Sequence, residues 1–375
     1  MSDWSIDWLT DWRDVWSPAF VEKWKSAYAE DTHPLASQFN HPSVVKPWCL
    51  TRPNYEGLEP RFLVATHPQG YWAMMPFVAT CPRWQNGFLT EIEPAGGIHF
   101  DYHDPVIAPV LTDPAVEASF WNAVQKTKVL HPGKGADAVS WPRSRRAREF
   151  TEWALAPSKA PFLDLRKYTD YDPYFASRKK SLREDVRRRT KRLHTLGPCR
   201  YETIESIEET TAIGWVRSLN RFQKQRYGGG PRLIFLEQLV REYFSSGGPL
   251  RMSALYVGNR DISWHVGFQL HDRQCPYIWS FDTEFSNFAP GKIHVSRAIE
   301  EAFRTHQDVF DFGMGVENYK FDWTDGDQYD VVGFSSESRS PVAAAKRQMR
   351  ATTKGVRGLS RQVAKIGKHT SRGLA

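Results

Sequence analysis

A short segment in the last quarter of the chain gathers side chains that could carry acid-base chemistry. A strand-like apolar run leads into Gly313 and Gly315, and a carboxylate, a phenol and an ammonium group follow at Glu317, Tyr319 and Lys320. Closely spaced glycines let the backbone approach a ligand, and reactive groups are commonly placed where strands end. We interpret Glu317, Tyr319 and Lys320 as candidate catalytic residues. A structural salt bridge between Lys320 and a nearby carboxylate is the alternative.

Three further side chains could accept a proton from an amine or hydroxyl nucleophile. A strand-like run ends at Phe281, Asp282 and Glu284 follow it, and His265 lies on the preceding strand candidate. Carboxylates and imidazoles act as general bases, directly or through water. Asp282 is therefore a fourth catalytic candidate, and His265 and Glu284 are candidates for binding an acceptor. A purely structural role is the alternative for each.

The residues after Glu284 form a strand-loop-helix turn that could meet a phosphate group. Pro290 and Gly291 are typical of the first turn of a helix, where backbone amides are unpaired and the helix dipole is positive. The residues predicted to contact the phosphates are Asn287, Phe288, Ala289, Gly291 and Lys292. The turn has a single glycine, so a structural Pro-Gly turn is the alternative.

The elements that must position these groups can be read from the C-terminal part of the chain. Helices are predicted near 177–196, 208–225 and 233–245, strands at 250–257, 262–270 and 276–281, then a helix over 290–305 and strands at 309–312 and 331–335. Gly258 and Asn259 indicate a hairpin between the first two strands. This order predicts an α+β layer fold.

The N-terminal part is predicted to form a helix-plus-sheet unit of its own. Trp4, Trp8, Trp12 and Trp16 recur at helical spacing and predict an amphipathic helix at the start of the chain. A chain of 375 residues exceeds the usual size of a single core. We expect two domains, 1–157 and 158–340, followed by a basic and disordered tail over 341–375.

The charge of the chain is concentrated in two places. The formal net charge is +7, but residues 339–375 hold ten Lys/Arg and no Asp/Glu, which leaves 40 basic and 43 acidic residues elsewhere. We therefore do not expect a general nucleic-acid-binding surface. Weak contact of the tail with anionic membranes is expected instead.

The four cysteines, Cys49, Cys81, Cys199 and Cys275, are far apart and form no C-x-x-C pair. This pattern supports neither a metal site nor a disulfide framework. The acidic first residues lack the features of a signal peptide, and no apolar run of about 18 residues is present. We expect a cytoplasmic protein, at most peripheral to the inner membrane.

Four segments together resemble the BioF2-like acetyltransferase family, which includes the CelD-type cellulose-biosynthesis proteins and is related to the Fem peptidyltransferases. They are Arg178–Leu193, Tyr277–Phe285, Ala289–Lys292 and Asp311–Trp323. The resemblance covers about residues 160–325. It implies tandem domains of the Gcn5-related N-acetyltransferase (GNAT) fold, the first of them degenerate, each with a mixed, mostly antiparallel sheet flanked by helices.

The resemblance also implies a reaction and its co-substrate. GNAT folds bind the pyrophosphate of coenzyme A at the turn that corresponds to 287–292, and Fem-type relatives use a lysine matching Lys320 to stabilise the charge on the attacked carbonyl. We expect acyl transfer from acyl-CoA, without a metal, to an amine or hydroxyl of a sugar, polysaccharide precursor or cell-envelope intermediate. The alternatives are a non-catalytic scaffold in polysaccharide assembly and a Fem-like aminoacyl transferase that uses charged tRNA.

Two basic segments could take part in binding. Residues 178–192 hold nine Lys/Arg, and a solvated helix, an anionic acceptor site and nucleic-acid binding are the open interpretations. Arg221 and Arg226 lie at a polar helix end before a glycine run, where they could close over an acceptor or belong to a linker.

Overall fold

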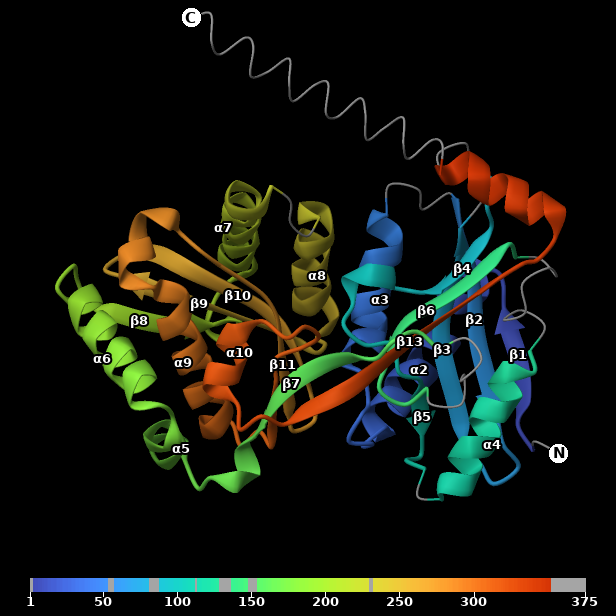
Figure 1. Ribbon diagram of the computed structural model, residues 1–375, viewed down its shortest axis with the longest axis horizontal. Coiled ribbons are helices and arrows are strands. Elements are labelled where there is room, and N and C mark those ends of the chain that lie inside the picture. Colours follow the sequence, from blue (N-terminus) through green and yellow to red (C-terminus); the bar gives the residue numbers. More distant parts are fainter. Residues whose placement is uncertain are drawn as a thin grey trace, which may run out of the picture.

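The computed structural model describes residues 3–52, 57–80, 88–111, 113–127, 136–147, 154–228 and 232–351. Figure 1 shows two halves side by side, each built from strands with helices packed against them. The strands form one 13-stranded sheet in the order β1-β2-β3-β4-β6-β13-β7-β12-β11-β10-β9-β8, with β5 paired to β3. The predicted α+β class, with a mixed and mostly antiparallel sheet flanked by helices, is confirmed.

In its described residues, the first half contains six strands and four α-helices, and these elements are bounded as follows. The strands are β1 (Ser5–Leu9), β2 (Leu58–Thr66), β3 (Trp72–Thr80), β4 (Glu91–Pro94), β5 (Val106–Ala108) and β6 (Ala138–Ser144). The helices are α1 (Trp12–Val15), α2 (Pro18–Glu30), α3 (Pro42–Thr51) and α4 (Pro114–Gln125), with short 3-10 turns η1 (Gln38–Asn40) and η4 (Gly97–His99).

The second half has the same kind of layers. Its strands are β7 (Ser158–Asp164), β8 (Cys199–Thr203), β9 (Leu250–Val257), β10 (Arg260–Leu270), β11 (Arg273–Phe281) and β12 (Val309–Asp311). Its helices are α5 (Tyr171–Ser177), α6 (Lys180–His194), α7 (Glu209–Tyr227), α8 (Leu233–Ser246), α9 (Pro290–Arg304) and α10 (Asn318–Trp323), with 3-10 turns η5 (Leu165–Lys167), η6 (Ile204–Ser206) and η7 (Thr283–Phe288).

The N-terminal segment differs from the expected helix. Residues Ser5–Leu9 form β1, which pairs antiparallel with β2. Trp4 and Trp8 both pack on the same core cluster, on one face of the sheet. A spacing of four residues puts side chains on one face of a strand as well as of a helix, so the tryptophan pattern could not separate the two. The predicted helix is therefore wrong for Ser5–Leu9, where pairing with β2 decides the structure, and is confirmed only at α1, Trp12–Val15.

The last strand joins the two halves. β13 (Gln328–Glu337) pairs through 328–331 with β7 of the second half. Its continuation, from Val332 to Glu337, pairs with β6 of the first half. Figure 1 shows β13 crossing the middle of the molecule between the two halves. A helix over 341–351 follows where the sequence predicted a disordered tail, and residues beyond 351 lie outside the described part of the chain.

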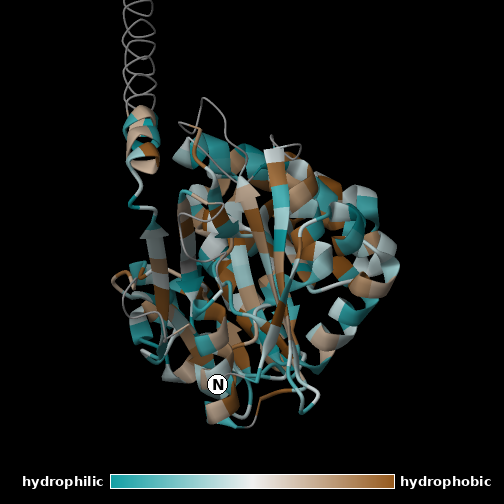
Figure 2. Ribbon diagram, turned by 90° about the vertical axis from the view of Figure 1, so that its right-hand side faces the viewer, coloured by the Kyte–Doolittle hydropathy of each residue, from teal (hydrophilic) through white to brown (hydrophobic). Residues whose placement is uncertain are grey.

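The halves also share a hydrophobic core. One cluster contains Trp24 and Phe62 of the first half together with Trp215, Leu236 and Phe268 of the second. Figure 2, which views the first half from its outer side, shows hydrophobic residues concentrated along the central strands. Because this core runs through both halves, the loops that meet between them are held against each other.

Candidate functional site

The candidate site lies where the parallel strands β11 and β12 separate. The two strands pair only at Arg273 with Val309 and at Gln274 with Phe310. β11 then continues to Phe281, whereas the chain leaves β12 after Asp311 and turns at Gly313, which has a φ of 70°. The loop that follows β12 therefore occupies the opening between the strands, next to the first half.

Asp311 fixes this loop to both halves. Its fully buried carboxylate accepts hydrogen bonds from the Tyr102 hydroxyl, at 2.7 Å, and from the Gly313 amide, at 2.9 Å. Arg145 and Arg273 also face it, at 3.4 and 3.5 Å. A buried carboxylate requires such partners, and these come from β11, from the loop after β12, from the residue that follows β6 and from another loop of the first half. The position of Gly313 is thus set by contacts across the two halves.

Lys320 holds the loop from its other side. Its Nζ donates to the backbone oxygens of Gly313, Met314 and Gly315, at 3.3, 2.9 and 3.3 Å. It also pairs with Glu317 Oε2 at 2.9 Å. The lysine side chain is 6% exposed and that of Glu317 is 59% exposed. Lys320 and Glu317 are therefore brought together, and the lysine organises the glycine loop in this state.

Tyr319 belongs to the same group of residues. Its ring is partly exposed, and burial, Glu317 and Tyr227 together raise the pKa of its hydroxyl. Burial acts to raise the pKa of Glu317, but the hydrogen bond from Lys320 lowers it overall. Glu317 is consequently ionised at neutral pH and a weak base. The strongest base of this centre must lie elsewhere.

Asp101, from the first half, is a stronger base than Glu317 because its pKa is raised, and the sequence did not predict it. It follows η4, its carboxylate accepts a backbone hydrogen bond from Met314, and Arg143 Nη1 lies 3.4 Å from it. Burial raises the pKa of Asp101 to about 6, although Arg143 and Lys320 act to lower it. A Cβ on Gly313 would lie 2.4 Å from Asp101 Oδ2, so this approach requires the glycine.

Asp282, which is buried, and Glu284, which is exposed, form a separate group. The guanidinium of Arg260 contacts both carboxylates. Asp282 also caps η7 by accepting a hydrogen bond from the Glu284 amide at 3.0 Å. Within the described residues, neither carboxylate contacts Glu317, Tyr319 or Lys320. The structure therefore does not bring Asp282 into the group around Lys320.

His265 lies inside the second half and is only 1% exposed. Its ring stacks on Trp279 at 4.2 Å and its Nδ1 lies 3.3 Å from the Ser253 hydroxyl. Burial lowers the pKa of His265 to about 3, so the imidazole is neutral at physiological pH. This environment suits a core residue better than a group that binds an acceptor.

The predicted phosphate turn packs against the basic helix α6. Arg189 donates to the Asn287 carbonyl at 2.9 Å, Lys292 pairs with Asp185 at 2.8 Å, and the guanidinium of Arg192 lies 5.2 Å from the ring centre of Phe288. The five predicted residues do lie together, at the start of α9, with cations of α6 beside them.

Few amides of this turn remain for a ligand. The amides of Lys292 and Ile293 donate to the Ala289 carbonyl, and Pro290 has no amide hydrogen. Among residues 290–293, Gly291 alone keeps an amide for a phosphate. A Cβ on Gly291 would lie 3.4 Å from Phe281, an ordinary contact, so the fold itself does not demand the glycine.

Arg221 and Arg226 lie on the exposed side near the end of α7. The Arg226 guanidinium stacks 4.8 Å from the ring of Phe281. Arg221 stacks instead on the adjacent Phe222, at 4.6 Å. Arg226 thus reaches the end of β11, and Arg221 makes a local contact.

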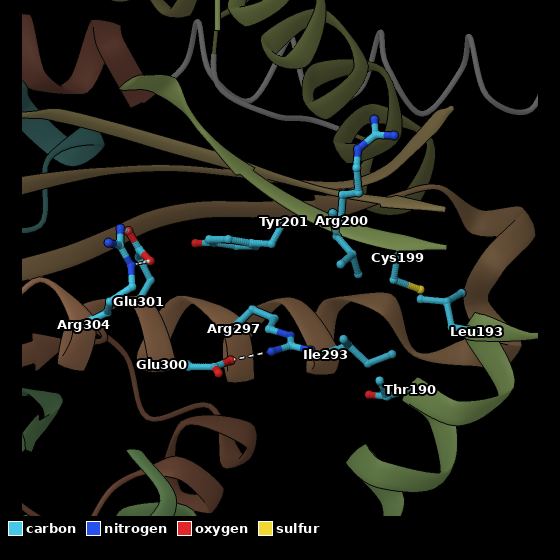
Figure 3. Close-up of a pocket in the computed structure, with 11 residues that line it drawn as sticks. Thr190, Leu193, Cys199, Arg200, Tyr201, Ile293, Arg297, Glu300, Glu301 and Arg304 are labelled. Carbon is cyan, nitrogen blue, oxygen red and sulfur yellow. Dashed lines mark hydrogen bonds and ion pairs between the residues drawn. The ribbon is translucent and has the colours of Figure 1, made fainter. Parts of the chain in front are cut away.

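A cavity of about 360 Å³ lies between α6, β8 and α9. Figure 3 shows that four of its charged side chains form pairs, Arg297 with Glu300 and Arg304 with Glu301. Arg200 also lines the cavity and pairs with Glu202 outside the lining. The cavity contains none of the residues around Lys320.

The described residues also limit other kinds of site. They contain no group of three or more His, Cys, Asp or Glu residues arranged to hold a metal ion. None of their helices combines the length and the apolar character that crossing a membrane requires.

Comparison with known proteins identifies the domain. Residues 180–321 match the family model described as Acetyltransferase (GNAT) domain. No curated protein sequence matches the chain.

Three solved structures resemble the fold. The crystal structure of FemX has a TM-score of 0.60 at 11% identity, covering 86% of this chain and 97% of that one. A conserved protein of unknown function from Bacteroides thetaiotaomicron has a TM-score of 0.51 at 10% identity, covering 89% and 100%. The C-terminal DUF2156 domain of an Agrobacterium fabrum protein has a TM-score of 0.50 at 11% identity, covering 88% and 95%. The chain therefore has the GNAT fold, and its residues 180–321 match a GNAT acetyltransferase domain.

Proposed function

We propose that the protein transfers an acyl group from an acyl-CoA-type thioester to an amine or hydroxyl of a sugar, polysaccharide precursor or cell-envelope intermediate. The observation that carries the proposal is the opening between β11 and β12, with Asp101 and Lys320 at its edge. The resemblance to BioF2-like and CelD-type proteins supports this acceptor class.

The chemistry needs a base, an oxyanion donor and orientation, and no covalent intermediate. Asp101 takes the proton of the acceptor amine or hydroxyl as that atom attacks the thioester carbonyl carbon. The carbon–sulfur bond then breaks, and the sulfur leaves as the thiol of coenzyme A after receiving a proton. Lys320 is the proposed oxyanion donor. It would give up one of its hydrogen bonds to the loop carbonyls and donate instead to the oxygen of the attacked carbonyl, where negative charge develops.

The donor is proposed to lie along the second half, with its pyrophosphate at 287–292. Gly291 offers a backbone amide there, and α6 adds positive charge beside it. Because these contacts are largely electrostatic, affinity for coenzyme A is expected to fall as salt is added.

The test is transfer by the full chain, with acetyl-CoA and a panel of amines and hydroxyl compounds. Thiol release and the mass of the acylated acceptor are measured together. Lys320→Ala should lower turnover by about 100-fold or more, as loss of an oxyanion donor does. The control is Lys180→Ala, which removes an exposed lysine on α6 that pairs only with Glu184. Equal turnover by both variants would remove Lys320 from the reaction.

A Fem-like aminoacyl transfer is the second candidate. The exposed cations of α6, among them Arg187, Arg188, Lys191 and Arg192, would suit a polyphosphate donor. Product that forms only with charged tRNA, and not with acetyl-CoA, would favour this reaction. Thioester-dependent product without tRNA would favour the first.

The basic C-terminal segment is proposed to contact anionic membranes weakly. Its described helix is tied to the first half by Lys346 with Asp137 at 2.9 Å and by Arg350 with Glu91. Deleting residues 352–375 should therefore lower binding to anionic vesicles at low salt while the fold stays intact. Unchanged sedimentation with such vesicles would contradict this.

A further inference from the structure

A recess between the two halves lies beside the centre around Lys320. It is formed by the end of α3, by η4, by the start of α8 and by β11. The side chains that line it are Trp48, Thr51, Arg52, His99, Arg232, Phe235 and Tyr277. Its free space is about 20 Å³, about enough for one water molecule, so only the end of a ligand can enter it and the rest would stay at its mouth.

Positive charge in this recess exceeds negative charge. The Arg52 guanidinium lies 4.5 Å from the ring centre of Trp48 and forms an ion pair with the Glu93 carboxylate at 3.1 Å. Arg232 has no carboxylate partner among the described residues. Burial and Arg52 lower the pKa of Arg232, which shows that the two guanidinium groups repel each other across the recess. An anion would relieve this repulsion.

The pKa of His99 reflects the same excess of positive charge. Burial lowers its pKa, and Arg52, Arg143 and Arg232 lower it further. These cations come from α3, β6 and the start of α8, so the field is centred between the halves. A positive field in a partly buried cleft concentrates anions there.

The recess lies close to the Asp101 carboxylate of the centre around Lys320. The Tyr277 hydroxyl, which lines the recess, donates to the His99 carbonyl at 2.6 Å. Burial and the Asp101 carboxylate raise the pKa of the same hydroxyl. A molecule that places one end in the recess can therefore present another atom to Asp101.

Several exposed apolar side chains neighbour these residues in the sequence. Ile98 precedes His99 and is 72% exposed, and Ile234 and Leu50 stand beside lining residues in the sequence. Val316 and Tyr227 are exposed next to Glu317 and Tyr319. Exposed apolar residues that gather around a cleft mark a binding surface.

We propose that the recess binds an anionic group, a phosphate or a carboxylate, of the acceptor, and that the apolar side chains around it contact the acceptor's body. The acceptor would then be an anionic molecule whose amine or hydroxyl reaches Asp101. That the bound molecule is the acceptor rests on the proposed function, whereas the anion site itself does not.

Binding of a simple anion tests the site without any transfer. Inorganic phosphate and acetate are titrated separately into the full chain, and the NMR signals of the arginine Nε–H groups and of His99 are followed. The Arg232→Gln variant should bind the preferred anion at least about tenfold more weakly, since it loses a charged hydrogen bond. The His99 pKa should rise when the anion binds.

Arg241→Gln is the matched control, because Arg241 lies on the same helix α8 and pairs with Glu237 on the surface. It should bind as the unaltered protein does. No perturbation of His99 by either anion, or equal weakening in both variants, would overturn the proposal. The stronger of the two probes identifies the group as phosphate or carboxylate.

Transfer to paired acceptors separates this proposal from the proposed function. Phosphoethanolamine is compared with ethanolamine, and β-alanine with propylamine, using acetyl-CoA. Arg232→Gln should raise KM at least about tenfold for the anionic member and leave KM for acetyl-CoA unchanged. Transfer without preference for anionic acceptors would refute the recess and keep the acyltransferase. Anion binding at His99 without any transfer would keep the recess and refute the reaction.

Discussion

At the scale of single residues, the pKa of Asp101 is the property that most directly governs the proposed reaction. The carboxylate form is the base, and burial places its pKa at about 6. The rate at low substrate should therefore rise with pH through about 6 and level off above it. Asp101→Asn should remove this limb and lower turnover by about 100-fold or more. Asp14→Asn, on exposed α1, is the control and should leave the profile unchanged.

The raised pKa of Asp101 affects the stability of the fold in the opposite direction: the rate rises with pH, whereas stability falls. A carboxyl whose folded pKa lies above its usual value of 3.8 holds a proton more tightly in the folded chain. Its contribution to stability is complete below pH 4 and is lost as the pH rises through about 6. The free energy of unfolding of the unaltered chain should fall between about pH 4 and pH 6. In denaturant titrations of Asp101→Asn, this fall should be smaller. Identical pH dependence in both would show that Asp101 is not buried.

The residues around Lys320 show what a local pattern can reveal. Gly313, Glu317 and Lys320 are close in sequence, so spacing alone predicted that they meet. Asp101 and Arg143 come from the first half, and the contacts of Asp311 with Tyr102 and Arg145 help to hold that half against the loop. No local periodicity encodes a contact between segments so far apart. The paired glycines before Asp101, both with positive φ, were the available signal.

At the scale of elements, the loop after β12 depends on close approach at Gly313. Gly313→Ala would place a Cβ 2.4 Å from Asp101 Oδ2 at a φ of 70°. Gly326→Ala is the matched control, because Gly326 also has a positive φ of 91° but no heavy atom within 4 Å of the added Cβ. In both variants, alanine at a positive φ costs about 1 kcal/mol of backbone strain. Gly313→Ala should lose more stability and more turnover than Gly326→Ala. Thermal unfolding and turnover measured on both variants check this.

Local signals predicted those elements whose ends carry strong turn or capping residues. Gly258 and Asn259 form the hairpin between β9 and β10, and Pro290 begins α9 as expected. The strand β3 reads as an apolar run because it is covered on both faces, with Met74 in one core cluster and Met75 in another. The double role of β13 could not be predicted, because its partners lie in both halves.

At the scale of the whole molecule, Asp311 connects the halves. Its carboxylate faces Tyr102 and Arg145 of the first half and Arg273 of the second. Asp311→Ala would leave two guanidinium groups without this counter-charge, and breaking a buried ion pair typically costs about 3–5 kcal/mol. Calorimetry should show a lower transition temperature for both halves together. Loss of stability in one half only would show that the halves are energetically independent.

The shared strand β13 has a consequence for biosynthesis. Proteins emerge from the ribosome N-terminus first, and domains generally complete folding in that order. Here the first half lacks the neighbour of β6 until residues 332–337, near the end of the described chain, have been translated. The edge of β6 therefore stays open while the second half is synthesised, exposed to pairing with other nascent chains. Maturation of the first half is thus tied to completion of the second, which delays its closure until almost the whole polypeptide has been made.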